Sequence, residues 1–499
     1  MAPPAAHEMQ QLKNTLRPSK RLCYVWLHVL LLFALFGLSK SQSIVDTLPG
    51  FSGELPFKLE TGYVSVGELN DVELFYYFIE SERDPARDPL ILWLTGGPGC
   101  SGFSGLVYEI GPLRFNYTAF NGSLPSLELN PYSWTKVASI IFLDAPVGTG
   151  FSYATNPDDY YASDTISARD NYIFIRKWLI DHPRFLYNPL YIGGDSYSGI
   201  IVPILTLEIA NGIQMGLKPL MTLMFYNWNG IQGYILGNPV THLHNDENSR
   251  IPFAHRIALI SDELYESAKN ACKGEFIDPD ESNGECMEVL AVITKCTEKL
   301  NSAHILEPVC ALDSPKPKES KLKWSLNHIE DVSSDMISLP VPQRSELWCR
   351  NYNYLLSYIW ENDEAVQEAL HVRNGTIPFW KRCNKTLDYD SNVVSTVPYH
   401  RNLSDLGYRA LIYSGDHDML IPYVGTERWV KSLNISVLNG WEPWFVDGQV
   451  AGYSVVYQAN KTESDITYAT VKGGGHTAPE FRPKQCLAMI DRWLAFYPL

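Results

Sequence analysis

The sequence lacks several features that would point to common classes of protein. It has no C-x-x-C motif and no His/Cys cluster with metal-ligand spacing, so we expect neither a metal nor a cofactor. It has no internal repeat, which excludes a solenoid or propeller. Basic residues are scarce, 40 Lys and Arg against 56 Asp and Glu, for a net charge of −16. This balance argues against nucleic acid or an anionic membrane as a partner.

Long hydrophobic runs are also missing, with one exception near the start of the chain. An apolar stretch, Leu22–Leu38, follows several basic residues and precedes Ser39 and Ser41, which are small and separated by one residue. This order predicts a secretory signal over residues 1–41. The alternative is a membrane anchor, but the stretch is at the short limit for crossing a bilayer. We therefore expect cleavage, no stable membrane anchor, and entry into the secretory route.

Cysteines are few and their number fits export. Cys23 lies in the predicted signal, and eight others remain, an even number that predicts disulfide bonds in a secreted chain. Eight cysteines allow 105 pairings, so the spacing does not decide among them. The chain also carries seven Asn-x-Ser/Thr sequons, which predict N-glycans on several of Asn116, Asn121, Asn374, Asn384, Asn402, Asn434 and Asn460.

Short apolar runs alternate with helical patterns from residue 90 to residue 240. This alternation predicts an α/β fold with a mostly parallel sheet covered by helices on both faces. We expect a core in two parts, 42–239 and 346–499, interrupted by an insertion over 240–345 that acts as a cap. Residues 312–342 of this insertion are rich in Lys, Ser, Pro and Asp, which predicts an exposed linker that is open to cleavage. The expected strands are Leu90–Leu94, Ser139–Leu143, Leu190–Ile192, Tyr234–Leu236, Ala410–Tyr413 and Thr467–Val471. The expected helices are Asp164–Asp181 and Pro483–Phe496.

A serine stands at the apex of a strand–turn–helix pattern in the middle of the chain. The segment Gly194-Asp195-Ser196-Tyr197-Ser198-Gly199 follows an apolar run and precedes an apolar amphipathic segment. A serine on such a sharp turn presents its hydroxyl to a substrate. The pattern G-x-S-x-G is not met in full, because Ser198 takes the place of the last glycine. A surface Gly/Ser turn is the alternative interpretation.

A serine hydroxyl needs a base, and the base needs an orienting acid. Asp416 and Asp418 follow the predicted strand Ala410–Tyr413, and His476 follows Thr467–Val471. Reactive groups collect at the carboxyl edge of an open α/β sheet. The order Ser, Asp, His along the chain is that of α/β-hydrolases.

An oxyanion hole is expected after an early strand, where the sequence reads Thr95-Gly96-Gly97-Pro98-Gly99. Pro98 has no N–H, so one donor must come from a glycine of this loop, Gly96, Gly97 or Gly99. Tyr197, directly after the serine, supplies the other. A tight Gly/Pro turn without a catalytic role is the alternative.

These segments together resemble the serine carboxypeptidase family of α/β-hydrolases over almost the whole mature length. The resemblance rests on the loop from Trp93 to Ser101, the run Asp144 to Tyr153, the elbow at Ser196, and the two strand ends with Asp418 and His476. It implies Ser196 as nucleophile, His476 as base and Asp418 as orienting acid, with Asp416 as a rival. It further implies an oxyanion hole of Gly97 and Tyr197, disulfides Cys100–Cys383, Cys272–Cys286 and Cys310–Cys349, and no assignment for Cys296 and Cys486.

Departures from the peptidases indicate a particular branch of this family. Peptidase members usually carry Asn before the double glycine that begins at Gly96, Glu before the nucleophile, and Met or a similar residue after the histidine. This chain has Thr95, Asp195 and Thr477 there. It thereby resembles the plant acyltransferase branch, whose members move an acyl group, often a hydroxycinnamoyl, from a 1-O-β-glucose ester to an alcohol. The expected partners are therefore a small acyl-glucose donor and an alcohol acceptor.

Glu109 is placed by the resemblance near Asp195, where two close carboxyls would share a proton and favour acidic pH. Two separately solvated carboxylates are the alternative.

Two other functions are kept beside the acyltransferase. A carboxypeptidase that acts at acidic pH shares every triad residue and is the second hypothesis; a glycoprotein that binds without turnover is the third. The resemblance implies vacuolar delivery, with export from the cell as the alternative. The oligomeric state is not indicated.

Overall fold

The computed structural model describes residues 42–499, apart from positions 68, 70, 118, 119 and 121 and the segments 215–229, 310–349 and 459–463. The chain divides into two units, Met1–Ser43 and Ile44–Leu499, and the account below concerns the second. The predicted signal, the linker 312–342, the pair Cys310–Cys349, Asn121 and Asn460 lie outside the described residues.

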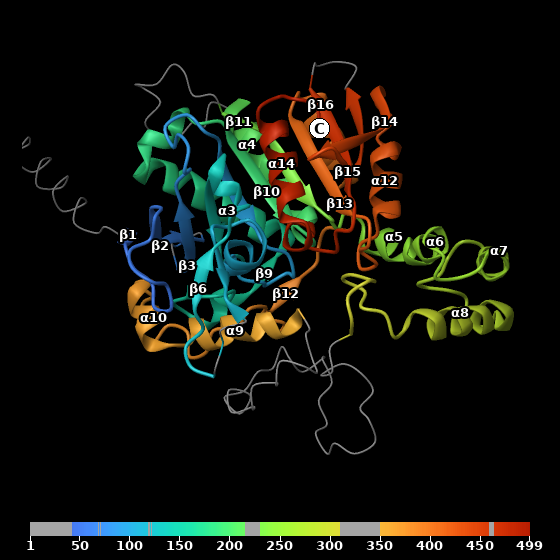
Figure 1. Ribbon diagram of the computed structural model, residues 1–499, viewed down its shortest axis with the longest axis horizontal. Coiled ribbons are helices and arrows are strands. Elements are labelled where there is room, and N and C mark those ends of the chain that lie inside the picture. The colour runs from blue at the N-terminus through green and yellow to red at the C-terminus, as the bar shows by residue number, and fades with distance from the viewer. Residues whose placement is uncertain are drawn as a thin grey trace, which may run out of the picture. The chain divides into compact units, whose positions relative to one another are not determined.

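A 12-stranded mixed sheet forms the centre of this unit (Figure 1). Its order is β1-β2-β3-β7-β4-β10-β11-β13-β16-β15-β14, with β8 paired to β3. The six strands from β7 to β16 in this order run parallel, and antiparallel strands flank them on both sides. These strands are β1 Gln42–Val45, β2 Leu59–Val66, β3 Val72–Ile79, β4 Leu90–Leu94, β7 Ser139–Leu143, β8 Tyr153–Ala154, β10 Leu190–Asp195, β11 Ile231–Gly237, β13 Arg409–Gly415, β14 Ser436–Val446, β15 Gln449–Gln458 and β16 Asp465–Val471.

The parallel strands are buried on both faces, as their continuous apolar sequences predict. All five residues of β4 and of β7 and all seven of β13 are buried. One face packs against α9 and α14, through Trp360 and Trp493 among others. The opposite face packs against α3, α4, α11 and α12, through residues such as Trp178 and Leu205. The fold is therefore the three-layer α/β-hydrolase arrangement that the sequence predicts.

The helices divide into those that cover the sheet and those of the insertion. The covering helices are α3 Asp164–Asp181, α4 Ser198–Gln214, α9 Asn351–Glu361, α10 Glu364–Ala369, α11 Val397–Asp405, α12 Tyr423–Ser432, α13 Ala478–Phe481 and α14 Pro483–Leu494. Those of the insertion are α5 Leu243–Asn248, α6 Arg250–Arg256, α7 Asp262–Ala271 and α8 Gly284–Thr297. Short turns and strands complete the list: η1 Gly105–Glu109, β5 Leu113–Phe115, β6 Leu127–Leu129, η3 Trp134–Lys136, η4 Pro157–Tyr160, β9 Ala162–Ser163, η5 Pro183–Tyr187 and β12 Tyr389–Asp390.

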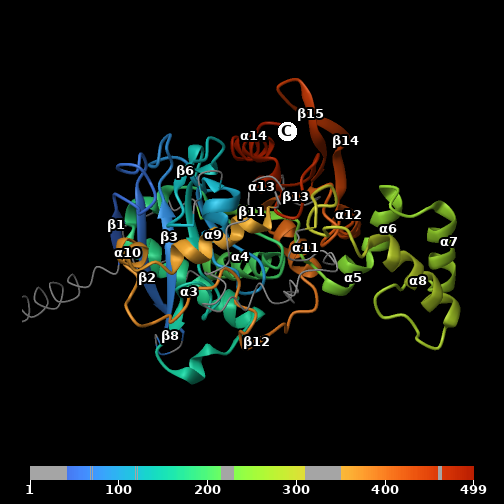
Figure 2. The same ribbon diagram turned by 60° about the horizontal axis from the view of Figure 1, so that its bottom comes forward.

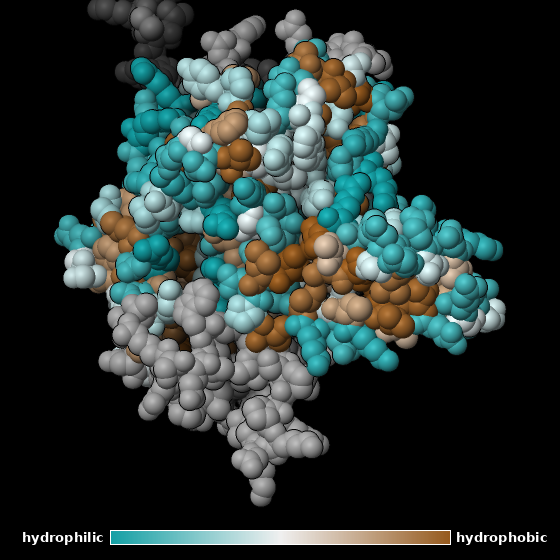
Figure 3. All heavy atoms as spheres, turned by 45° about the vertical axis from the view of Figure 1, so that its right-hand side comes forward, coloured by the Kyte–Doolittle hydropathy of each residue, from teal (hydrophilic) through white to brown (hydrophobic). Residues whose placement is uncertain are grey.

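The four helices of the insertion, called here the α5–α8 arm, form a group beside α12 (Figure 2). The arm has its own small cluster of buried residues, Ala254, Ile260, Ala268 and Ile293. Hydrophobic atoms are also visible on its surface in Figure 3. The large exposed apolar side chains of the arm and of the segment that follows it are Leu243, Ile277, Met287, Val292 and Leu306.

Two of the expected disulfides are confirmed, Cys100–Cys383 and Cys272–Cys286. Within the described part of the chain, Cys296 is exposed and Cys486 is buried, and neither is in a disulfide. Among the sequons, Asn374, Asn402 and Asn434 are exposed and Asn116 is half-buried. Asn384 is half-buried too, and its Nδ2 donates to the Gly148 carbonyl at 2.9 Å, so a glycan there would compete with this bond.

Candidate active site

Ser196 lies at the turn between β10 and α4 and has a φ of +55°, in the left-handed region that few serines adopt. Such backbone strain is typical of a nucleophile elbow. The turn is tight because a Cβ on Gly194 would lie 2.5 Å from the Leu94 carbonyl, and a Cβ on Gly199 would lie 2.3 Å from the Val240 carbonyl. At Gly199, therefore, α4 comes close to the loop that follows β11.

The serine in place of the motif's last glycine is accommodated by a hydrogen bond. Ser198 Oγ donates to the Leu94 carbonyl at 2.9 Å and is buried. The side chain therefore ties the start of α4 to the end of β4, which explains the departure from G-x-S-x-G.

The structure brings Ser196, His476 and Asp418 together from three strand ends. His476 Nε2 lies 2.8 Å from Ser196 Oγ, and His476 Nδ1 lies 2.8 Å from Asp418 Oδ2. Asp418 is fully buried. Because the carboxylate accepts a hydrogen bond from the Nδ1–H group, the proton of the neutral ring stays on Nδ1 and Nε2 is left free to accept the serine proton. The arrangement has the geometry of a nucleophile, a general base and an orienting acid.

Asp416, the rival for the acidic position, points elsewhere. Its Oδ1 lies 2.5 Å from His417 Nδ1 and accepts the N–H of Gly473 at 2.6 Å. It therefore stabilises the loop that precedes His476, whereas Asp418 contacts the imidazole itself.

Asn238 is a neighbour of the triad to which the sequence analysis gave no role. Its Nδ2 donates to Asp418 Oδ2 at 2.8 Å, and its Oδ1 accepts the N–H of Gly415 at 3.1 Å. The N–H groups of Leu420 and Ile421 also donate to Asp418, at 2.7 and 3.3 Å. These hydrogen bonds satisfy the oxygens of the buried carboxylate and fix its orientation. The signal available in the sequence was an Asn two residues after the predicted strand Tyr234–Leu236.

Burial by itself lowers the pKa of His476, but the charge of Asp418 and its hydrogen bond outweigh this, with a further contribution from Asp195. The net result is a pKa raised above the ordinary value for histidine. An imidazolium that forms during proton transfer is therefore stabilised where it forms.

The loop after β4 approaches the elbow closely enough to form an oxyanion hole. A Cβ on Gly96 would lie 2.6 Å from Ser196 Cβ and 2.9 Å from the nitrogen of Tyr197. The N–H of Gly96 donates to Asp195 Oδ1 at 3.3 Å. Across the described residues, the N–H groups of Gly97 and Tyr197 have no hydrogen-bond acceptor, so both are available to a substrate oxygen.

Glu109 and Asp195 are both buried next to this loop, with 5% and 4% of their surfaces exposed. The alternative of two separately solvated carboxylates is therefore wrong. Burial, followed by the charge of Asp195, raises the pKa of Glu109 well above its usual range. Burial also raises the pKa of Asp195 to about 6, against the opposing effect of His476. In the acidic range the pair therefore carries at least one proton and can donate a hydrogen bond as well as accept one.

The two threonines that distinguish this chain have different surroundings. Thr95 lines a pocket, and its buried Oγ1 has no hydrogen-bond partner among the described residues. Thr477 Oγ1 donates to Glu480 Oε2 at 2.8 Å, and the hydroxyl of Tyr354 donates to the same oxygen at 2.8 Å. Tyr354, brought here by α9, carries no signal in the sequence that would place it near His476.

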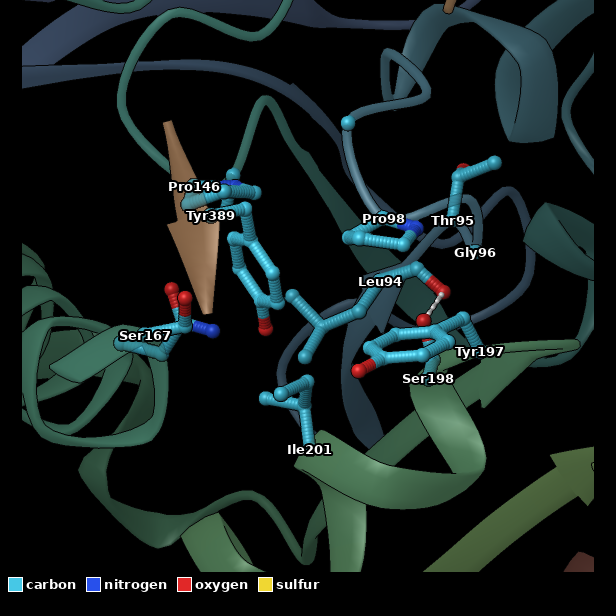
Figure 4. Close-up of a pocket in the computed structure, with 13 residues that line it drawn as sticks. Leu94, Thr95, Gly96, Pro98, Pro146, Ser167, Tyr197, Ser198, Ile201 and Tyr389 are labelled. Atoms are coloured by element: carbon cyan, nitrogen blue, oxygen red, sulfur yellow. Dashed lines mark hydrogen bonds between the residues drawn. The ribbon is translucent and has the colours of Figure 1, made fainter. Parts of the chain in front are cut away.

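A pocket lies on the α3–α4 side of the elbow (Figure 4). Its wall includes the rings of Tyr197 and Tyr389, whose centroids are 6.1 Å apart and whose hydroxyls both donate to Asp164 Oδ1. Asn171, which is almost fully buried, also lines the pocket, and its Oδ1 has no partner in the part of the chain that is described. Aromatic walls and unpaired polar atoms are typical of a small-molecule site.

No group of three or more His, Cys, Asp or Glu side chains suited to a metal ion occurs among the described residues. Within those same residues, no helix has both the length and the apolar character needed to cross a bilayer.

Comparison with known proteins identifies the family. The family model for serine carboxypeptidases matches residues 49–495. The chain belongs to the serine carboxypeptidase family. Among curated relatives, it is 47% identical to serine carboxypeptidase-like 7 of Arabidopsis thaliana over 95% of this chain and 99% of that protein. It is also 47% identical to serine carboxypeptidase-like 2 of the same plant, over 94% and 97%.

Among solved structures, the chain resembles Kex1(delta)p, a prohormone-processing carboxypeptidase from Saccharomyces cerevisiae. The TM-score is 0.67 at 20% identity, over 91% of this chain and 95% of that one. At this identity the similarity concerns the fold. Family and fold together agree with the expectations from the sequence.

Proposed function

We propose that this member of the serine carboxypeptidase family is an acyltransferase that moves an acyl group from a 1-O-β-glucose ester to an alcohol. The observation that carries the proposal is the hydrogen-bonded chain Ser196–His476–Asp418 beside two backbone N–H groups, those of Gly97 and Tyr197, that have no acceptor among the residues the structure describes. Thr95, Asp195 and Thr477 stand where peptidases of the family usually have Asn, Glu and Met, and they favour transfer over peptide hydrolysis.

The first half-reaction forms an acyl-enzyme. Ser196 Oγ attacks the ester carbonyl carbon while His476 Nε2 takes the hydroxyl proton. The carbonyl oxygen becomes an oxyanion that accepts hydrogen bonds from the N–H groups of Gly97 and Tyr197. One such donor is worth about 3 kcal/mol in comparable sites. The bond between the acyl carbon and the anomeric oxygen then breaks, and glucose leaves with the proton from His476.

The second half-reaction transfers the acyl group. His476 takes the proton of the acceptor alcohol, whose oxygen attacks the acyl carbon; the bond to Ser196 Oγ breaks, and Oγ regains a proton from His476. Transfer exceeds hydrolysis when the acceptor is bound close to the ester and water is kept away.

Glu109 and Asp195 are proposed to bind hydroxyl groups of the sugar or the acceptor. A carboxyl pair that retains a proton at acidic pH both donates and accepts hydrogen bonds, which suits a polyol.

A serine carboxypeptidase is the second candidate. The observation that favours it is the same carboxyl pair, because a protonated carboxyl can also bind the terminal carboxylate of a peptide. We expect both activities to depend on Ser196, so the substrate decides between them.

The test is one assay at pH 5–6 with two kinds of substrate. The purified protein receives a 1-O-acyl-β-glucose with a panel of alcohols and, separately, a blocked dipeptide; Ser196→Ala is the control. We expect new esters that depend on Ser196 and no release of amino acid. Release of the terminal amino acid without ester formation would overturn the proposal in favour of the peptidase. Absence of turnover with both substrates would favour a binding glycoprotein.

We further propose that the mature protein is an N-glycosylated product of the secretory route, in the vacuole or outside the cell. The exposed Asn374, Asn402 and Asn434 support this. Glycosidase treatment of the protein from its native tissue, followed by mass measurement, tests it.

A further inference from the structure

A short segment after the α5–α8 arm lies against both loops that carry the triad acid and base. We call Ser302–Ile305 the strap. The N–H of His476 itself donates to the carbonyl of Ala303 at 2.7 Å, and the N–H of Met419, next to Asp418, donates to the carbonyl of Ser302 at 2.8 Å. The N–H of Ile305 donates to the carbonyl of His417 at 3.1 Å. The strap therefore joins the acid loop to the base loop by backbone bonds.

His304 adds a side-chain contact to these bonds. Its Nδ1 accepts the N–H of Leu306 at 3.2 Å, so Nε2 carries the proton and donates to the carbonyl of Gly473 at 3.2 Å. The ring is 5% exposed, stacks on His417 at 5.5 Å between centroids, and packs on Phe481 at 4.5 Å. Both ring nitrogens are thus used, and neither faces a substrate.

The fit between strap and loops is close. A Cβ on Gly475 would lie 2.6 Å from the Ala303 carbonyl and 2.8 Å from the His304 ring. A Cβ on Gly415 would lie 2.2 Å from the Gly475 carbonyl, so the two loops also touch each other. Small displacements of the strap therefore move the backbone of His476.

We infer that His304 is a positioning residue: by donating to Gly473 it holds the strap against the base loop and sets the distance between His476 and Ser196. The inference depends on the triad being reactive, and it is independent of whether the acyl donor is a glucose ester or a peptide. A misplacement of about 1 Å in such a site costs on the order of a hundredfold in rate.

The test uses a probe that reacts with the triad alone. A fluorophosphonate forms a bond between Ser196 Oγ and phosphorus, fluoride leaves, and His476 takes the hydroxyl proton. The second-order rate constant of this reaction, measured from pH 4 to 8, reports on His476 without any substrate pocket. If the unaltered protein is not labelled, the triad proposal fails. The role of the strap is tested separately, by comparing the labelling rate constant of each variant with that of the unaltered protein.

Two amide substitutions, each of which replaces one of the two ring nitrogens, separate the contacts of His304. His304→Gln keeps an N–H donor near the Gly473 carbonyl, and His304→Asn keeps an acceptor for Leu306 but loses that donor. We expect labelling within about threefold of the unaltered rate for the glutamine variant, and a loss of roughly ten- to a hundredfold with a shifted pH profile for the asparagine variant. His255→Ala, in the arm and hydrogen-bonded to Asp262, is the matched control and should label at the unaltered rate.

The kinetic parameters give the second readout. With whichever acyl donor is turned over, His304→Asn should lower kcat and leave KM within about twofold, since the strap does not contact the carboxyl pair or the pocket. Equal labelling rates and unshifted profiles for the two variants would overturn the inference. A rate loss for His304→Gln as large as that for His304→Asn would also overturn it, because the bond to Gly473 would then not be the cause.

Discussion

The sheet region and the α5–α8 arm differ sharply in how deeply their residues are buried. Every residue of β13 is buried, and so is every residue of β4 and β7. In the arm, α7 buries only Ala268 and α8 only Cys286 and Ile293. The sheet region is a scaffold with two large apolar layers, whereas the arm has one small cluster of four buried apolar side chains and one disulfide.

The difference shows where a rigid site can be built. Ser196, Asp418 and His476 all follow strands of the sheet, so their relative positions are fixed by the most stable part of the protein. The arm has little burial to stabilise it, and it reaches the site through the strap. We therefore expect substitutions in the sheet region to affect chemistry and global stability, and those in the arm to have local effects.

The largest effect is expected from the buried acid at the end of β13. Asp418→Asn should lower kcat by roughly ten-thousandfold, because the amide no longer fixes the Nδ1-protonated form of His476. Asp416→Asn should cost less than about tenfold, since an amide oxygen still accepts the Gly473 N–H. Steady-state kinetics on both variants measure the contrast. Equal losses would contradict the assignment of roles to the two aspartates.

Truncation of one buried isoleucine in each region tests the difference in packing. Ile412→Ala, in the middle of β13, should lower the free energy of unfolding by about 2–5 kcal/mol, because it leaves a cavity in a close-packed layer. Ile293→Ala in α8 should leave the main transition unchanged and open the arm alone. Denaturant unfolding combined with hydrogen exchange distinguishes the two. A shift of the global transition for Ile293→Ala would show that the arm and the sheet unfold together.

Removal of the arm disulfide should destabilise the arm locally. Cys272 and Cys286 are 14 positions apart, and a loop of that length corresponds to about 3 kcal/mol of lost chain entropy in the unfolded state. The double serine variant should show faster amide exchange in α7 and α8 and an unchanged melting temperature for the sheet region. Unchanged exchange in α7 and α8 would indicate that helix packing alone holds the arm.

The smallest expected effect concerns pH and the carboxyl pair. Burial and the charge of Asp195 raise the pKa of Glu109 in the folded protein. The contribution of Glu109 to stability is therefore complete below the pKa that this residue has in the unfolded chain, near 4. This contribution is lost as the pH rises above that value. Asp195 behaves likewise, with the loss centred between about 4 and 6. The melting temperature should fall as pH rises through this range and beyond, and Glu109→Gln should flatten the fall. The exposed Glu288→Gln is the control; equal slopes in both variants would contradict this account.

The sequence predicted the six parallel strands of the sheet because their signals are local, but it did not predict the antiparallel strands that flank them. Leu90–Leu94, Ser139–Leu143 and the helix Asp164–Asp181 were predicted with the bounds that the structure has. The other parallel strands were predicted one to three residues short at their ends, where polar or glycine residues continue the ladder. The last helix ends at Leu494 rather than Phe496.

Other features were missed because they depend on contacts between distant segments. β14 is the edge strand next to β15, and most of its residues are exposed, so it shows no apolar run to recognise. Tyr354 reaches the site from α9, and the strap reaches it from the end of the insertion. Asp416 and Asp418 could not be separated by sequence, since only the direction of each side chain distinguishes them.

The central claim is that Ser196 carries the acyl group during transfer. Intact-mass measurement on protein mixed at pH 5–6 with an accepted 1-O-acyl-β-glucose, followed by peptide mapping, tests it directly. The account predicts one acyl adduct on the peptide that contains Ser196, its disappearance with ester formation when the alcohol is added, and no adduct in Ser196→Ala. Ester formation by Ser196→Ala at the unaltered rate would contradict the account.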